Sequence, residues 1–124
     1  MTVLPCPTES DEQQSLFKWA KLSEGLYPDL KLLHAIPNGG LRNKVTAARL
    51  QREGVKPGVP DICLPMPRGD FKGLYIEMKR IRGGTVSQEQ IQWIMGLRMN
   101  GYCAEICKGW EKAKDLILWY LGQA

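Results

Sequence analysis

Two short apolar segments near the middle of the chain are separated by a polar stretch that contains glycine and proline. The first follows Pro60-Asp61, and in the second, residues 74–79, apolar residues alternate with others. Such alternation is typical of a β-strand with two different faces. The pattern therefore predicts a hairpin whose second strand directs Tyr75, Glu77 and Lys79 to the face opposite its apolar side chains.

Helical periodicity flanks this hairpin on both sides. Residues 8–24 read as an amphipathic helix, with Ser10 and Gln13 as a capping box. The pattern predicts further helices over residues 43–53, 87–100 and 110–121, and further strands over residues 30–36 and 102–107. We therefore expect a single α/β domain over residues 1–124, in which a small mixed sheet is flanked by helices.

Two polar residues lie on apolar helix faces. Glu12 shares the stripe of Leu16, where a buried carboxylate needs a partner, although an acid in a first turn also favours the helix dipole. Gln90 shares a helix face with Trp93, Ile94 and Leu97, so we expect it to face inward. It also lies three residues after Ser87, where it completes a capping box. Both residues are candidates for a site, and both have an ordinary structural explanation.

Asp61, Glu77 and Lys79 form a compact group of complementary chemistry. The hairpin brings an aspartate at the head of one strand beside an acid and an amine on one face of the other. Carboxylates of this kind bind a divalent cation, and the ammonium can lie next to a phosphate. We expect the chemistry of the protein here.

The basic residues are concentrated around this group. Residues 39–82 contain ten Lys or Arg and four Asp or Glu, a net charge of +6 in a chain whose total is +4. A basic zone around an acidic pair suits a polyanionic substrate handled through a metal ion, although an ordinary solvated surface has the same composition.

The segment that follows residues 30–36 is a second place for phosphate contacts. His34 precedes the turn Pro37-Asn38-Gly39-Gly40, whose main-chain amides could approach a phosphate. A lone histidine at a strand end is more often structural, and a plain turn explains residues 37–40 equally well.

The remaining features exclude several classes of protein. No apolar run approaches the roughly 20 residues of a membrane span, and the first residues do not have the pattern of a signal peptide. We therefore expect an intracellular protein in which Cys6, Cys63, Cys103 and Cys107 are buried thiols. Their spacing contains no CxxC pair, which disfavours a zinc site without excluding it.

The residues assembled above resemble the VRR-NUC family of the PD-(D/E)xK nuclease superfamily. Pro60-Asp61 matches its PD motif, and residues 77–79 match its ExK motif. More specific motifs occur in the order that the family shows: HAIPNGGLR (34–42), GVKPGVPD (54–61), GLYIEMK (73–79) and SxxQxxW (87–93). The resemblance extends from about Glu12 to the last helix.

This resemblance implies a restriction-endonuclease-like core and a nuclease that depends on Mg²⁺ or Mn²⁺. By motif position, Asp61, Glu77 and the main-chain carbonyl of Met78 would bind the metal, and Lys79 would orient water or stabilise phosphorane charge. Glu12 takes the place of the first-helix acid, as a catalytic residue and metal ligand, and Gln90 that of the glutamine after the ExK strand.

Stand-alone proteins of this size, typical of phage and bacterial genomes, resemble homodimers that cut branched DNA such as four-way (Holliday) junctions. The resemblance thus implies a junction resolvase with no small-molecule cofactor. A silent DNA-binding module and a nuclease acting on ordinary duplex or DNA ends are the alternatives. Candidate DNA contacts are His34, Asn38, Gly39, Arg42, Arg49 and Arg82.

Overall fold

The computed structural model describes residues 5–37 and 44–124. Along the chain, the elements are α1 (Glu9–Leu22), the 3₁₀-helix η1 (Pro28–Leu32), β1 (His34–Ala35), α2 (Lys44–Arg52), β2 (Ile62–Leu64), β3 (Leu74–Lys79), α3 (Gln88–Met99), β4 (Cys103–Lys108) and α4 (Trp110–Leu121). None of the helices in the described ranges is long and apolar enough to cross a membrane.

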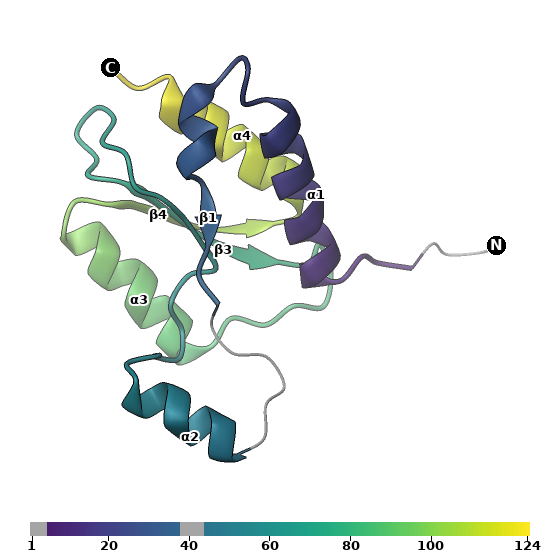
Figure 1. Ribbon diagram of the computed structural model, residues 1–124, viewed down its shortest axis with the longest axis vertical. Coiled ribbons are helices and arrows are strands. Elements are labelled where there is room, and N and C mark those ends of the chain that lie inside the picture. The colour runs from purple at the N-terminus through teal and green to yellow at the C-terminus, as the bar shows by residue number, and fades with distance from the viewer. Residues whose placement is uncertain (1–4, 38–43) are drawn as a thin grey trace.

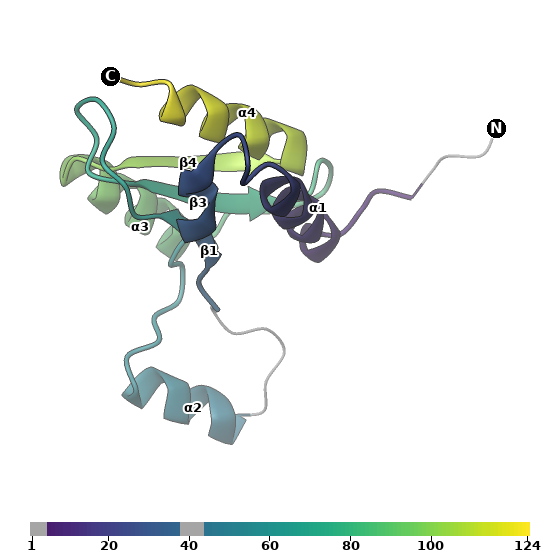
Figure 2. The ribbon, with the colours of Figure 1, turned by 45° about the horizontal axis from the view of Figure 1, so that its top comes forward.

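The strands form one mixed sheet in the order β1-β2-β3-β4 (Figure 1). β1 pairs with β2 and β2 pairs with β3 in antiparallel orientation, whereas β3 and β4 are parallel. Helices α1 and α4 pack on one face, and α3, which connects β3 to β4, lies on the other (Figure 2). The expected α/β architecture with a small mixed sheet is confirmed.

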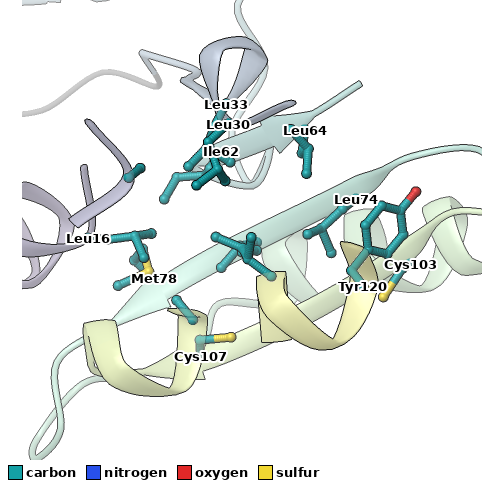
Figure 3. Close-up of a cluster of buried hydrophobic side chains, with 14 residues drawn as sticks. Leu16, Leu30, Leu33, Ile62, Leu64, Leu74, Met78, Cys103, Cys107 and Tyr120 are labelled. Carbon is teal, nitrogen blue, oxygen red and sulfur yellow. The ribbon is translucent and has the colours of Figure 1, made fainter. Parts of the chain in front are cut away.

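The core lies between the sheet and the α1–α4 pair (Figure 3). Its largest fully buried side chains include those of Leu16, Ile62, Leu74, Ile117 and Tyr120. The alternation predicted for residues 74–79 contributes one row of apolar side chains to this core, and the opposite row carries the polar residues of the candidate site.

The N-terminal cap of the first helix lies two residues before the predicted one. Thr8 is extended, its hydroxyl accepts a hydrogen bond from the Asp11 N–H at 3.0 Å, and Asp11 Oδ2 accepts one from the Thr8 N–H at 3.0 Å. The prediction of Ser10 and Gln13 as the capping box is therefore wrong. Ser10 is instead inside the helix, where it accepts a hydrogen bond from Gln14.

Two other predictions need correction. The strand predicted over residues 30–36 is a 3₁₀-helix followed by two strand residues. Pro28 fixes a helical φ at the start of this helix, and Leu30 within it and Leu33 directly after it are buried. The helix α2 confirms the predicted element from Lys44 onward, but no residue in it is buried. Its predicted apolar side therefore packs on no core, and α2 lies apart from the sheet (Figure 2).

Candidate active site

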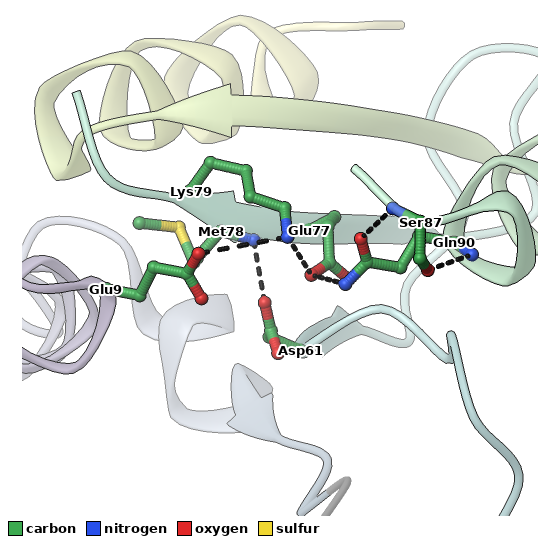
Figure 4. Close-up of polar contacts among 7 residues, drawn as sticks. All are labelled: Glu9, Asp61, Glu77, Met78, Lys79, Ser87 and Gln90. Atoms are coloured by element: carbon green, nitrogen blue, oxygen red, sulfur yellow. Dashed lines mark hydrogen bonds and ion pairs between the residues drawn. The ribbon is translucent and has the colours of Figure 1, made fainter. Parts of the chain in front are cut away.

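Asp61 is held at the head of β2 by the chain that leads to it. Its Oδ2 accepts a hydrogen bond from the main-chain N–H of Met78 at 2.8 Å, which ties it to β3 (Figure 4). Gly58 lies so close to the first turn of α3 that a Cβ there would be 2.5 Å from the carbonyl carbon of Glu89, and its φ is +88°. Only glycine allows the main chain to come this close to α3 at this φ. Pro60, which is buried, directly precedes Asp61.

Glu77 is the most confined carboxylate of the site. Only 2% of the residue is exposed, and its Oε1 accepts a hydrogen bond from Gln90 Nε2 at 2.9 Å. Its Oε2 is buried and has no hydrogen-bond partner among the described residues. Burial, and next the nearby Asp61, raise the pKa of Glu77 to about 8. A buried oxygen without a donor beside a second carboxylate is an arrangement that a cation would stabilise.

Lys79 bridges two acids from different elements. Its Nζ is 3.8 Å from Glu77 Oε1 and 3.8 Å from Glu9 Oε1, and the residue is 5% exposed (Figure 4). Glu9 belongs to the first turn of α1 and is partly exposed. The site therefore combines β2, β3 and α1, with a buried ammonium at its centre.

Gln90 has both of the roles that its position suggested. Its Oε1 accepts a hydrogen bond from the Ser87 N–H at 2.9 Å, which completes the capping box of α3. Its Nε2 meanwhile donates to Glu77. The cap fixes the amide, and the amide in turn orients the carboxylate.

Glu12 is buried as expected, but its contacts lie elsewhere. Its Oε1 accepts a hydrogen bond from the main-chain N–H of Trp110, the first residue of α4, at 3.3 Å. Within residues 5–37 and 44–124, no three His, Cys, Asp or Glu side chains form a group able to hold a metal. The expected set of Asp61, Glu77 and Glu12 is thus not assembled, and the α1 acid that reaches the site is Glu9.

Asp61, Glu77 and the adjacent Met78 carbonyl nevertheless fit a hard divalent cation. Mg²⁺ is commonly bound by one or two carboxylates, with water or substrate oxygens completing its coordination. The orphaned Oε2 of Glu77 supplies the observation on which this fit depends.

The predicted DNA contacts are less well defined. His34 is exposed on β1, with Nδ1 2.9 Å from the Leu32 carbonyl oxygen, and Arg82 is exposed after β3. Arg49 is exposed on α2, where it lies 3.7 Å from Glu53. The predictions for Asn38, Gly39 and Arg42 fall outside the described residues.

All four cysteines are free thiols. Cys63, Cys103 and Cys107 are buried, and burial raises the pKa of Cys107 to about 12. Cys6 is only half-buried, so the expectation of burial is wrong for this one residue.

Comparison with known proteins agrees with this geometry. The family model described as VRR-NUC domain matches residues 4–111. A solved structure described as a VRR_NUC domain protein matches with a TM-score of 0.84 and 30% sequence identity, covering 98% of this chain and 93% of that chain. No match is found among curated proteins.

Proposed function

Since the chain belongs to the VRR-NUC family of nuclease-type domains, we propose that it is a metal-dependent endonuclease that hydrolyses phosphodiesters in branched DNA. The more specific proposal is a four-way-junction resolvase that acts as a homodimer. The observation that carries the proposal is the group of Asp61, Glu77 and Lys79, in which one oxygen of the buried Glu77 carboxylate lies near the Lys79 ammonium and the other has no hydrogen-bond partner among the described residues.

A Mg²⁺ or Mn²⁺ ion would be held by the carboxylates of Asp61 and Glu77 and by the Met78 carbonyl. When bound, such an ion supplies Lewis acidity toward a phosphoryl oxygen and lowers the pKa of a coordinated water. Asp61 is suited to this role because its Oδ2 is oriented by the Met78 N–H. Gln90 orients Glu77 through the hydrogen bond to Oε1, which leaves Oε2 for the cation.

Lys79 supplies positive charge that is present before substrate binds. Its ammonium is held between Glu77 and Glu9, so it cannot swing freely away from the site. A fixed, desolvated ammonium stabilises the charge that develops on the phosphoryl oxygens more strongly than a hydrated one. We assign Lys79 to this stabilisation or to orienting the attacking water, and Glu9 to holding its ammonium in place.

DNA would be bound largely through its phosphates. Arg49 on exposed α2, and Arg82 and His34 near the ends of β3 and β1, are suitably exposed donors. We include Asn38, Gly39 and Arg42 in this surface on the motif alone. Phosphate contacts carry little sequence information, so selectivity for branches would come from DNA shape and from the spacing of two active sites in a dimer.

The test is a cleavage assay on a labelled panel of four-way junction, flap, splayed arm, plain duplex and single strand. The expected result is paired, symmetric cuts in the junction with Mg²⁺ or Mn²⁺ and none with EDTA. Equal cutting of every substrate would retain the nuclease and remove branch selectivity. Binding of the junction without cutting, by folded protein in either metal, would favour a silent DNA-binding module instead.

A further inference from the structure

Glu12 is the one buried carboxylate in the described part of the chain that the proposed chemistry does not use. It is 4% exposed on α1, its Oε1 accepts the hydrogen bond from the Trp110 N–H, and its Oε2 has no hydrogen-bond partner among the described residues. The cap of α4 is Gly109, which has no side chain to satisfy the N–H groups of that helix. The carboxylate of Glu12, 98 residues before Trp110 in sequence, therefore caps α4 in place of a local side chain and lies at the positive end of the helix dipole.

The same short segment also holds the end of β3. The Gly109 N–H donates a hydrogen bond to the Lys79 carbonyl oxygen at 2.9 Å. Gly109 has φ of +91°, and a Cβ there would be 3.0 Å from Ile81 Cγ1 and 3.6 Å from Glu12 Oε2. Glycine therefore allows the main chain to pass between α1 and Ile81, just after β3, and Gly109-Trp110 joins Glu12 to the backbone of Lys79.

We propose that Glu12 is a positioning residue that sets where α1 sits on β3, and thereby brings Glu9 to Lys79. Residues three apart lie on the same face of a helix, so Glu9 and Glu12 approach β3 together. Glu9 contacts the ammonium of Lys79 at 3.8 Å, and Glu12 is linked to its carbonyl through Trp110 and Gly109. One face of α1 thus holds both the side-chain ammonium of Lys79, through Glu9, and its main-chain carbonyl, through Glu12 and residues 109–110. The catalytic consequence rests on the proposed function, whereas the positioning itself does not.

The role of Glu12 in positioning α1 can be tested without an activity assay. Glu12→Leu keeps apolar bulk on the core side of α1 and removes the acceptor, and Glu12→Gln keeps an acceptor oxygen. In crystal structures, we expect the Glu9 carboxylate to move out of ion-pair range of Lys79 Nζ in Glu12→Leu but not in Glu12→Gln. An unchanged Glu9–Lys79 contact in a folded Glu12→Leu protein contradicts the proposal. If that variant does not fold, Glu12→Met, which is unbranched like glutamate, is used in its place.

The kinetic test separates positioning from a general structural role. If Glu12 acts through Glu9, then Glu12→Leu lowers kcat on the cleaved substrate by about tenfold or more in the wild-type background. It then has no further effect in a Glu9→Gln background. A purely structural role lowers kcat by the same factor in both backgrounds, which overturns the proposal. Glu111→Gln, which removes an exposed acid from the first turn of α4, is the matched control and should leave kcat unchanged. If wild-type protein cuts nothing, the proposed function fails, and the crystallographic comparison still decides the positioning.

Discussion

Replacing Glu77 with glutamine should stabilise the metal-free protein at neutral to alkaline pH. Glu77 is 2% exposed, and its Oε2 has no hydrogen-bond partner among the described residues. Its pKa rises from an ordinary value of 4.5 to about 8, chiefly through burial and then through Asp61. Glutamine keeps an oxygen to accept the hydrogen bond from Gln90 and carries no charge. The variant therefore removes the cost of ionising a buried carboxylate.

The sign and size of the effect follow from this pKa. Between pH 4.5 and about 8, the unfolded chain has lost the Glu77 proton while the folded protein retains it. The folded state then binds more protons, so its stability falls as pH rises through this range. A shift of this size corresponds to roughly 5 kcal/mol at about 1.4 kcal/mol per pKa unit. This shift already includes the attraction between Lys79 and ionised Glu77. The glutamine amide that replaces Oε2 would be buried without a partner among the described residues, at a cost of about 1–3 kcal/mol, so we expect a net gain of about 2 kcal/mol.

The free energy of unfolding is measured by urea denaturation in EDTA at about pH 5 and about pH 8, with tryptophan fluorescence as the signal. Glu77→Gln should be more stable than wild type at the higher pH, and the difference should shrink toward the lower pH. Added Mg²⁺ should stabilise wild type but not the variant. Glu53→Gln, at an exposed acid on the surface next to α2, is the control and should show no such pH dependence. If the variant is less stable than wild type at the higher pH, or differs from it equally at both pH values, then ionisation of buried Glu77 does not limit the stability of the metal-free protein.

Two further substitutions test the parts that hold the site. Gly58→Ala should destabilise the protein by more than the ~1–2 kcal/mol of an unfavourable backbone conformation, because its Cβ would also overlap the main chain of Glu89. Gly54→Ala, where φ is +101° but no atom lies within 4 Å of the new Cβ, should show the conformational cost alone, and equal losses in urea unfolding would exclude the proposed contact. Gln90→Glu keeps the cap of α3 but places a further acid, besides Asp61, against Glu77, so the free energy of unfolding without metal should fall more steeply with pH than in wild type. A parallel pH dependence of the two proteins would show that the Gln90 side chain does not contact Glu77 in solution.

The sequence predicted most of the fold because local patterns and buried surfaces agree there. The alternation of residues 74–79 corresponds to a strand with one apolar row, and Ser87 and Gln90 form the predicted cap. The prediction failed for residues 30–36, where a short apolar run fits a strand or a helical turn equally and Pro28 decides between them. The packing of α2 was also not predictable, because a weakly apolar face does not show whether any neighbour covers it.

The group of Asp61, Glu77 and Lys79 could be predicted because two adjacent strands bring them together by register alone. The acid on α1 could not be assigned in this way. Helical periodicity placed Glu12 on the buried face, correctly, but it does not show which neighbouring element meets each buried side chain. Here Glu12 contacts the main-chain N–H of Trp110 at the start of α4, which lies far away in sequence. The corrected helix start at Thr8 puts Glu9 in the first turn, and its contact with Lys79 depends on how α1 packs against β3.

The most direct test of the account is cleavage of a labelled four-way junction by wild type, Lys79→Ala and Lys21→Ala. Lys21 is an exposed lysine at the end of α1 and serves as the matched control. Wild type and Lys21→Ala should cut the junction with Mg²⁺ or Mn²⁺ and not with EDTA, and a folded Lys79→Ala protein should not cut it. Cutting by Lys79→Ala at the wild-type rate, or cutting by wild type that EDTA does not stop, would contradict the assignment of the active site.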